Sequence, residues 1–297
     1  GIRACLSGVL LEVGNLGETF LKAAIDFHDS WDGKAEGRIK VFFGPHSMYL
    51  CGPEYLQETT EEALKRKTRI HIHLSESRQE VADCIEKYGI SPVQHLADLG
   101  MFECRTLAAH CVHVSLEDME LLEKHKVSVI NNPTSNMKLA NGFAPIDSML
   151  KKGINVALGT DGSASNNNVN LFEEMHLAAL VNKAVNDDAE SLSAKQVLRM
   201  ATINGAKALG LEKEIGSLEL GKRADLILLD ANKPHYFPRH NPVSSIVYSA
   251  QAADVRTMMV NGEVLMENYV VKTIDVGETM REGERMAFDL VNKTKES

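Results

Sequence analysis

Short apolar runs recur along the chain, and each run is followed by a polar loop and then by a helical pattern. Five such runs lie at residues 38–43, 69–74, 106–109, 127–130 and 155–158. They begin about 20 to 40 residues apart, which is the length of a strand, a loop and a helix in a parallel βα unit. We therefore predict an α/β fold built on a parallel sheet.

Polar residues directly follow each of these runs, at the end of the predicted strand where a parallel barrel assembles its active site. An open, doubly wound sheet would also collect polar groups there, but no Gly-x-Gly-x-x-Gly motif follows any of the runs. We therefore favour a TIM-type (β/α)8 barrel. Helical patterns at residues 61–67 and 171–183 fit this fold, and Ser115, with Asp118 three residues later, is expected to cap a further helix.

The pattern changes after residue 213, where a small β unit is expected. Residues 216–221 and 224–230 have the composition of short strands. Residues 256–260 and 263–266 flank Asn261-Gly262, a dipeptide typical of two-residue β-hairpins. The predicted division is a barrel, a small β unit and a charged helical tail, at residues 1–213, 214–271 and 272–297.

Composition narrows the class of protein. The 297 residues are 44% hydrophobic, enough for a large core, and carry a net charge of -9. Nucleic-acid binding needs clustered Lys and Arg, so this charge argues against it. The apolar stretches are strand-length, which argues against a membrane span. Five cysteines without a Cys-x-x-Cys pair favour reduced thiols and a cytoplasmic protein.

Two residues near the end of the second run, His73 and Glu76, are the first candidates for chemistry. Alternation along a strand places His71 and His73 on the same face, and Glu76 follows where the backbone turns out. His73 and Glu76 can therefore reach a common centre. An edge strand with solvated histidines would produce the same pattern.

Further candidates follow the third and fifth runs. His110 ends an apolar run, although a hydrogen-bonded core histidine has the same appearance, and His113 is interpreted as a loop or helix-cap residue. Asp161 follows a buried run between glycines, as a turn aspartate also can. Helix capping could account for Ser165. Together, His73, His110 and Asp161 make a mixed nitrogen and oxygen ligand set suited to zinc, and Glu76 could transfer protons beside it.

The order of the motifs resembles the amidohydrolase superfamily, and within it the 5′-methylthioadenosine/S-adenosylhomocysteine deaminases and their 5′-deoxyadenosine deaminase relatives. The resemblance extends from residue 1 to about residue 266. It is carried by the segments Gly-Pro-His-Ser, His-Leu-Ser-Glu, Ala-Ala-His-Cys-Val-His, Asn-Pro-Thr-Ser-Asn and Gly-Thr-Asp-Gly. Residues 216–230 resemble the superfamily's β-sandwich segment, so the resemblance implies a small β-sandwich at residues 214–271.

The resemblance also implies a role for individual residues. His73 and Asp161 are expected to bind a divalent metal, zinc by preference, and His110 to complete the metal shell or assist catalysis. Glu76 is similar to the proton shuttle of the family, and Asp161 is expected to take a proton from water. Glu76 and His110 are also expected to contact the substrate. His46 and Ser165 are similar to pocket residues that position the nucleoside.

The activity implied is hydrolytic deamination of an adenine nucleoside to the hypoxanthine nucleoside and ammonia. The expected partner is therefore a small nucleoside, with no nucleic acid and no membrane, and the family suggests a homo-oligomer. No Pro-Cys-x-x-Cys motif is present, which separates the chain from the compact zinc deaminases of cytidine and transfer RNA.

The chain departs from the family pattern in two respects. The family carries a His-x-His pair on its first strand, whereas His71-Ile-His73 occupies the place of the fifth strand. We therefore expect an N-terminal part to be missing, with two strands, two metal ligands and half of the β-sandwich, and we expect weak metal binding and little activity from this chain alone. Residues 8–22 contain no arginine, which argues against recognition of an amino-acid tail such as that of S-adenosylhomocysteine.

Two alternatives remain open on the sequence. One is another amidohydrolase that acts on an amino- or chloro-substituted heteroaromatic ring of the guanine or triazine type. The other is an inactive, truncated barrel that serves as a binding or structural subunit.

Overall fold

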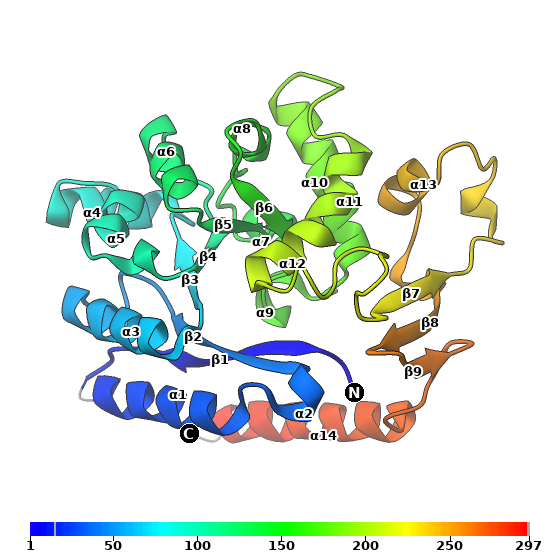
Figure 1. Cartoon of the computed structure of the whole chain (residues 1–297), viewed down its shortest axis with the longest axis horizontal. Coiled ribbons are helices and arrows are strands. Elements are labelled where there is room, and N and C mark those ends of the chain that lie inside the picture. Colours follow the sequence, from blue (N-terminus) through cyan, green and yellow to red (C-terminus); the bar gives the residue numbers. More distant parts are fainter. Residues whose placement is uncertain (15, 296–297) are drawn as a thin grey trace.

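The computed structural model describes residues 1–14 and 16–295. Its main element is a sheet of six parallel strands in the order β1-β2-β3-β4-β5-β6. The strands follow one another around an arc, with helices on the outer side (Figure 1). They are β1 (Ala4–Leu10), β2 (Ile39–Pro45), β3 (Ile70–Leu74), β4 (Thr106–His110), β5 (Ser128–Asn131) and β6 (Asn155–Leu158).

Helices connect consecutive strands, which confirms the predicted βα alternation. Those up to β6 are α1 (Gly17–Trp31), α2 (Lys34–Gly37), α3 (Pro53–Arg66), α4 (Arg78–Tyr88), α5 (Pro92–Asp98), α6 (Leu116–Lys124), α7 (Pro133–Lys138) and α8 (Ile146–Lys151). Those after β6 are α9 (Ser163–Asn166), α10 (Leu171–Val185), α11 (Ala194–Met200) and α12 (Ile203–Leu209). Ser115 begins α6 in the predicted capping box, with its hydroxyl accepting from the Asp118 N–H.

The five predicted strands are confirmed as β2 to β6, and β1 was missed. β1 pairs in parallel with β2 from Ala4 opposite Ile39 to Leu10 opposite Pro45. The sheet has β1 and β6 at its two ends, and no pairing between them occurs in the described part of the chain. The structure therefore shows an α/β fold with a curved parallel sheet, and a closed barrel is not observed.

The parallel direction of the strands sets where the site can be. All six strands end at the same edge of the sheet, so residues that follow β2, β3, β4 and β6 come together there. The strands are anchored by a buried core that includes Phe43, Ile72 and Leu122. Every residue of β4 is buried, which fixes the position of His110 at its end.

The small β unit is a separate antiparallel sheet in the order β10-β9-β8-β7. The strands are β7 (Leu226–Leu229), β8 (Val255–Val260), β9 (Glu263–Glu267) and β10 (Val270–Val271), with α13 (Pro242–Tyr248) between β7 and β8. The predicted hairpin is confirmed, since β8 and β9 pair across Asn261 and Gly262, whose φ angles are 54° and 83°. In the described residues, this small β unit consists of one sheet and not of a sandwich of two.

The prediction of a strand at residues 216–221 is wrong. This segment forms bends and turns, and the side chains of Leu218 and Leu220 are exposed. Its alternation of polar and apolar residues has no neighbouring strand to pair with in the described chain.

Arg3 connects the two sheets. It directly precedes β1, and its guanidinium donates to both carboxylate oxygens of Asp225, which directly precedes β7, at 2.7 and 3.1 Å.

The tail forms the helix α14 (Val276–Lys295), as the sequence predicted. Several apolar side chains on it are exposed, among them Met280, Met286 and Phe288. Over the residues that the structure describes, no helix combines the length and apolar character needed to cross a membrane.

A buried carboxylate, Asp254, organises the loop that precedes β8. It is 2% exposed and accepts hydrogen bonds from Lys233 Nζ at 2.8 Å, from His235 Nε2 at 2.9 Å and from the Tyr236 hydroxyl at 2.9 Å. Burial alone would raise the pKa of Asp254, but these donors, together with the Gln251 N–H, hold that pKa well below its usual range. The ionised carboxylate is therefore part of the folded structure.

Replacing Asp254 with Asn should lower the free energy of unfolding at pH 7 by about 2 kcal/mol, because the buried carboxylate that accepts these charge-assisted hydrogen bonds is lost. A depressed folded-state pKa stabilises the fold above the unfolded-state pKa of about 4, and the effect is lost as the pH falls through the folded-state value. Denaturant unfolding should thus show a smaller difference between the two proteins at pH 3 than at pH 7. Asp289→Asn, which changes an exposed pair with Arg285 on α14, is the matched control and should cost less than about 1 kcal/mol.

Candidate metal centre and active site

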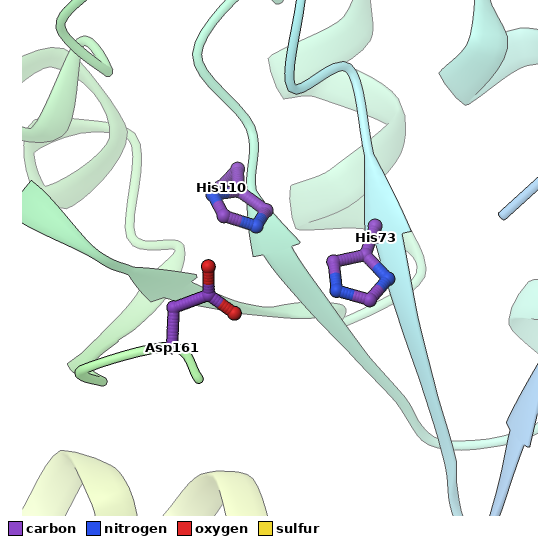
Figure 2. A group of neighbouring side chains, drawn as sticks. All are labelled: His73, His110 and Asp161. Carbon is purple, nitrogen blue, oxygen red and sulfur yellow. The ribbon is translucent and has the colours of Figure 1, made fainter. Parts of the chain in front are cut away.

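Three side chains converge at the carboxyl edge of the parallel sheet. His73 lies on β3, His110 ends β4, and Asp161 follows β6. Their ligand atoms all lie within 4.8 Å of one another. Figure 2 shows the two imidazoles and the carboxylate directed toward a common space between the strands. The structure thus brings together the three residues that the sequence singled out as metal ligands.

The backbone is strained where these residues leave the sheet. His110, Cys111 and Asp161 have positive φ angles of 73°, 47° and 60°, and Ser75 on the turn after β3 has a φ of 50°. Residues other than glycine rarely occupy this region, and each such conformation costs on the order of 1–3 kcal/mol. Strain of this kind tends to concentrate at functional sites, and here it turns the side chains toward the centre.

Hydrogen bonds fix which nitrogen of each histidine faces the centre. His73 Nδ1 lies 2.7 Å from the carbonyl oxygen of His46. His110 Nδ1 lies 2.8 Å from Asn136 Oδ1. An oxygen of this type can only accept, so each Nδ1 donates a proton to it, and Nε2 is the nitrogen left to face the centre. Metal-binding histidines are usually oriented by a hydrogen bond of this kind from the nitrogen that does not bind the metal.

The Asp161 carboxylate is held by two hydroxyl groups. Its Oδ2 accepts from Ser135 Oγ at 2.7 Å and from Ser165 Oγ at 2.5 Å. Burial by itself would raise the pKa of Asp161. These hydrogen bonds and the nearby His110 have the opposite and larger effect, so the pKa of Asp161 lies below its usual value. The group therefore stays ionised, with Oδ1 left to face a cation. Two imidazole nitrogens and one carboxylate fit a divalent metal such as zinc.

Glu76 lies next to the metal-binding group without belonging to it. Its Oε2 is 3.7 Å from His110 Nε2, and its Oε1 accepts from Asn141 Nδ2 at 2.8 Å. The side chain is half-buried. This is a suitable place for a carboxylate that exchanges protons with a substrate bound at the centre.

The two predicted pocket residues take different positions. The His46 ring is 4.6 Å from the His73 ring and packs edge-on against Tyr49 at 5.9 Å. Burial and, less strongly, the neighbouring His73 lower the pKa of His46, which favours the neutral imidazole. Ser165 instead donates its hydroxyl to Asp161, and its contact with a nucleoside stays a prediction.

Sequence reasoning missed the residues that hold the site together. Asn136 and Asn141 orient His110 and Glu76, and both lie in or near the Asn-Pro-Thr-Ser-Asn motif, which was noticed but given no role. His113, interpreted as a loop or helix-cap residue, lies in the loop after β4, and its Nε2 is 2.7 Å from the Asn141 carbonyl oxygen. A buried carboxylate, Glu80, was also missed. Its spacing of four residues from Glu76 was the available signal.

Comparison with known proteins assigns the chain to a class. A family model described as the amidohydrolase family matches residues 1–265. The chain therefore belongs to the amidohydrolase family, in agreement with the motifs and with the metal-binding group at the sheet edge.

Particular relatives are close in sequence. The chain is 54% identical over 293 residues to a 5-methylthioadenosine/S-adenosylhomocysteine deaminase of Caldanaerobacter subterraneus subsp. tengcongensis, covering 98% of this chain and 68% of the relative. It is 47% identical over 293 residues to a 5′-deoxyadenosine deaminase of Methanosarcina acetivorans, with 98% and 67% covered. The chain thus spans about two thirds of the length of these relatives.

A solved structure supports the fold. An adenosine deaminase from Xanthomonas campestris with bound zinc superimposes with a TM-score of 0.93 at 31% identity, covering 98% of this chain and 66% of that chain. Together with the family assignment, this agreement shows a TIM-like α/β fold.

Proposed function

We propose that the site performs the zinc-dependent hydrolytic deamination of an adenine nucleoside, with 5′-methylthioadenosine, 5′-deoxyadenosine or S-adenosylhomocysteine as substrates. The observation that carries the proposal is the convergence of His73, His110 and Asp161 within 4.8 Å, with Glu76 beside them. The names of the relatives support the substrate class, and the zinc-bound adenosine deaminase supports the metal. The reaction converts the adenine ring and water to the hypoxanthine ring and ammonia.

Asp161 is the proposed base. A zinc ion held by His73, His110 and Asp161 would lower the pKa of water toward neutrality. Asp161 takes a proton from that water, and its two serine partners keep the carboxylate ionised and oriented. The oxygen then forms a bond to C6 of the purine ring, and the proton is passed on toward the departing amine.

Glu76 is the proposed proton shuttle. It protonates a ring nitrogen next to C6, which makes C6 electrophilic, and it recovers a proton as the ring re-forms. The bond from C6 to the amine breaks, and ammonia leaves. Asn141 holds Oε1 of Glu76, and Oε2, 3.7 Å from His110 Nε2, is the oxygen proposed to face the ring.

His46 and Ser165 are proposed to position the nucleoside. A cavity of about 320 Å³ opens beside Tyr49, the residue that packs on His46, and is also lined by Met48, Cys51 and Tyr88. We place the ribose and its 5′ substituent at this cavity. The charged residues at its wall are Glu12, Glu80 and Asp83, with Lys87 as the one cation. This acidic balance and the lack of arginine in residues 8–22 disfavour a 5′ substituent that carries a carboxylate.

A substrate panel tests the proposal. In contrast to the low activity expected from the sequence alone, the purified, zinc-loaded protein should release ammonia from 5′-methylthioadenosine and 5′-deoxyadenosine, more slowly from S-adenosylhomocysteine, and not measurably from guanine or melamine. Ammonia can be followed by a coupled assay and the purine product by its absorbance. Turnover of guanine or melamine in preference to the nucleosides would point to the heteroaromatic-ring alternative. Tight nucleoside binding without ammonia release would favour a binding subunit.

The same proposal extends to the complete fold, the cellular location and the oligomeric state. The six-stranded arc is proposed to be part of a (β/α)8 barrel, and the small antiparallel sheet part of a β-sandwich. A cytoplasmic location is supported by the five free cysteines. A homo-oligomer is supported by the exposed apolar side chains of α14.

A further inference from the structure

The turn that carries Glu76 is held by a carboxylate outside the site. Ser75 is fully buried and has a φ of 50°. Its N–H donates to Glu80 Oε1 at 2.8 Å, and the N–H of Glu76 donates to Glu80 Oε2 at 2.7 Å. The two oxygens of one side chain thus engage two successive backbone groups.

Glu80 is itself fixed in place. It lies in the first turn of α4 and is 7% exposed, and its N–H donates to the Ser77 hydroxyl at 3.1 Å. The opposite side of the turn is held by the His113 N–H, which donates to the Ser75 carbonyl at 2.9 Å. The left-handed conformation of Ser75 is unfavourable by itself, so these contacts keep the turn from relaxing.

The direction of the Glu76 side chain depends on this turn. Its carboxylate must sit between Asn141, at 2.8 Å, and His110, at 3.7 Å. A displacement of about 1 Å in a catalytic group can lower a rate by about 100-fold. Release of the Ser75 and Glu76 N–H groups would allow a displacement of this size.

We propose that Glu80 is the positioning residue for Glu76, and that its two hydrogen bonds to the backbone place the proton shuttle against the substrate ring. The proposal rests on the function proposed above. Glu80 lies outside the group of His73, His110 and Asp161. It forms part of the wall of the 320 Å³ cavity, but both of its carboxylate oxygens are engaged by the N–H groups of residues 75 and 76, and its proposed action is through these two residues.

The test compares Glu80→Gln and Glu80→Ala with Asp118→Asn. Asp118 is the matched control because it is also buried in the first turn of a helix, α6, and accepts a backbone N–H, that of Ser115, at 2.9 Å. With 5′-methylthioadenosine and equal zinc content, Glu80→Ala should lower kcat by about 10- to 100-fold and leave KM within about twofold. Glu80→Gln should lie between Glu80→Ala and the unchanged protein, because the amide oxygen can still accept one N–H.

Amide hydrogen exchange supplies a second measurement that does not depend on activity. The N–H groups of Ser75 and Glu76 should exchange at least about tenfold faster in Glu80→Ala than in Asp118→Asn, at a temperature where circular dichroism shows all variants folded. An unchanged kcat in Glu80→Ala, or an equal loss in Asp118→Asn, would overturn the positioning role while the deaminase proposal stands. No turnover by the unchanged protein would instead overturn the deaminase proposal and this role with it.

Discussion

Replacing Glu76 with Gln is expected to lower kcat for 5′-methylthioadenosine by about 10²- to 10⁴-fold, the usual contribution of a general acid–base group. Gln has nearly the same shape and can keep the hydrogen bond from Asn141 Nδ2, so the fold and the metal-binding group should persist. It cannot deliver a proton to the ring nitrogen. The decrease should therefore appear in kcat, measured by ammonia release, with zinc content unchanged.

The matched control for this prediction is Glu86→Gln. Glu86 is exposed on α4, so the same chemical change occurs at a distance from the proposed proton transfer. It should leave kcat within about twofold of the unchanged protein, since surface substitutions are usually near neutral. Near-normal turnover by Glu76→Gln would remove the shuttle role from Glu76.

The three residues of the candidate metal site could be predicted because they lie at positions defined by the strands. An apolar run ends where a buried strand leaves the sheet, and parallel strands end at one edge. His73, His110 and Asp161 each occupy such an end, so their convergence follows from the order of the runs. The sequence could not predict that their ligand atoms lie within 4.8 Å of one another, because this closeness depends on turns with positive φ at residues that are not glycine.

The contacts that orient the site could not be predicted in the same way. Asn136 meets His110 across 26 residues of sequence, and Asn141 meets Glu76 across 65. Such pairs depend on how α7 and the loop after it pack over the strand ends. The spacing of Glu80 from Glu76 was visible, but an acidic residue in the first turn of a helix is also a common surface feature.

The two errors in strand prediction have a common physical cause. β1 has Ser7 and Gly8 in its middle and is mostly only partly buried, so it lacks a continuous apolar run. Residues 216–221 alternate in polarity as a strand does, yet Leu218 is 81% exposed. A strand requires a hydrogen-bonding neighbour, and the pattern of a single segment does not show whether that neighbour exists.

Replacing Asp161 with Asn is expected to lower turnover by about 10³-fold or more, because one change removes both the proposed metal ligand and the proposed base, and a base alone contributes about 10²- to 10⁴-fold. The neutral amide gives up the negative charge that offsets a divalent cation, so zinc should also be lost, as measured by chelator competition and elemental analysis of the purified protein. The Ser135 and Ser165 hydroxyls can still hydrogen-bond the amide oxygen, so the turn after β6 should keep its shape.

Ser165→Ala provides a graded comparison for Asp161→Asn. It keeps the carboxylate and removes the hydrogen bonds from the Ser165 hydroxyl to Asp161 Oδ2, at 2.5 Å, and to the Gly162 carbonyl, at 3.1 Å. Zinc affinity should therefore fall by about 10- to 100-fold, the typical effect of losing a group that orients a metal ligand. If Asp161 binds the metal, affinity must decrease in the order unchanged protein, Ser165→Ala, Asp161→Asn. Because Ser165 is also proposed to position the nucleoside, turnover is compared at saturating zinc and saturating nucleoside, where it must recover in Ser165→Ala but not in Asp161→Asn. Tight zinc binding retained by Asp161→Asn would show that the cation is held elsewhere, and the reaction assigned to this edge of the sheet would then lose its basis.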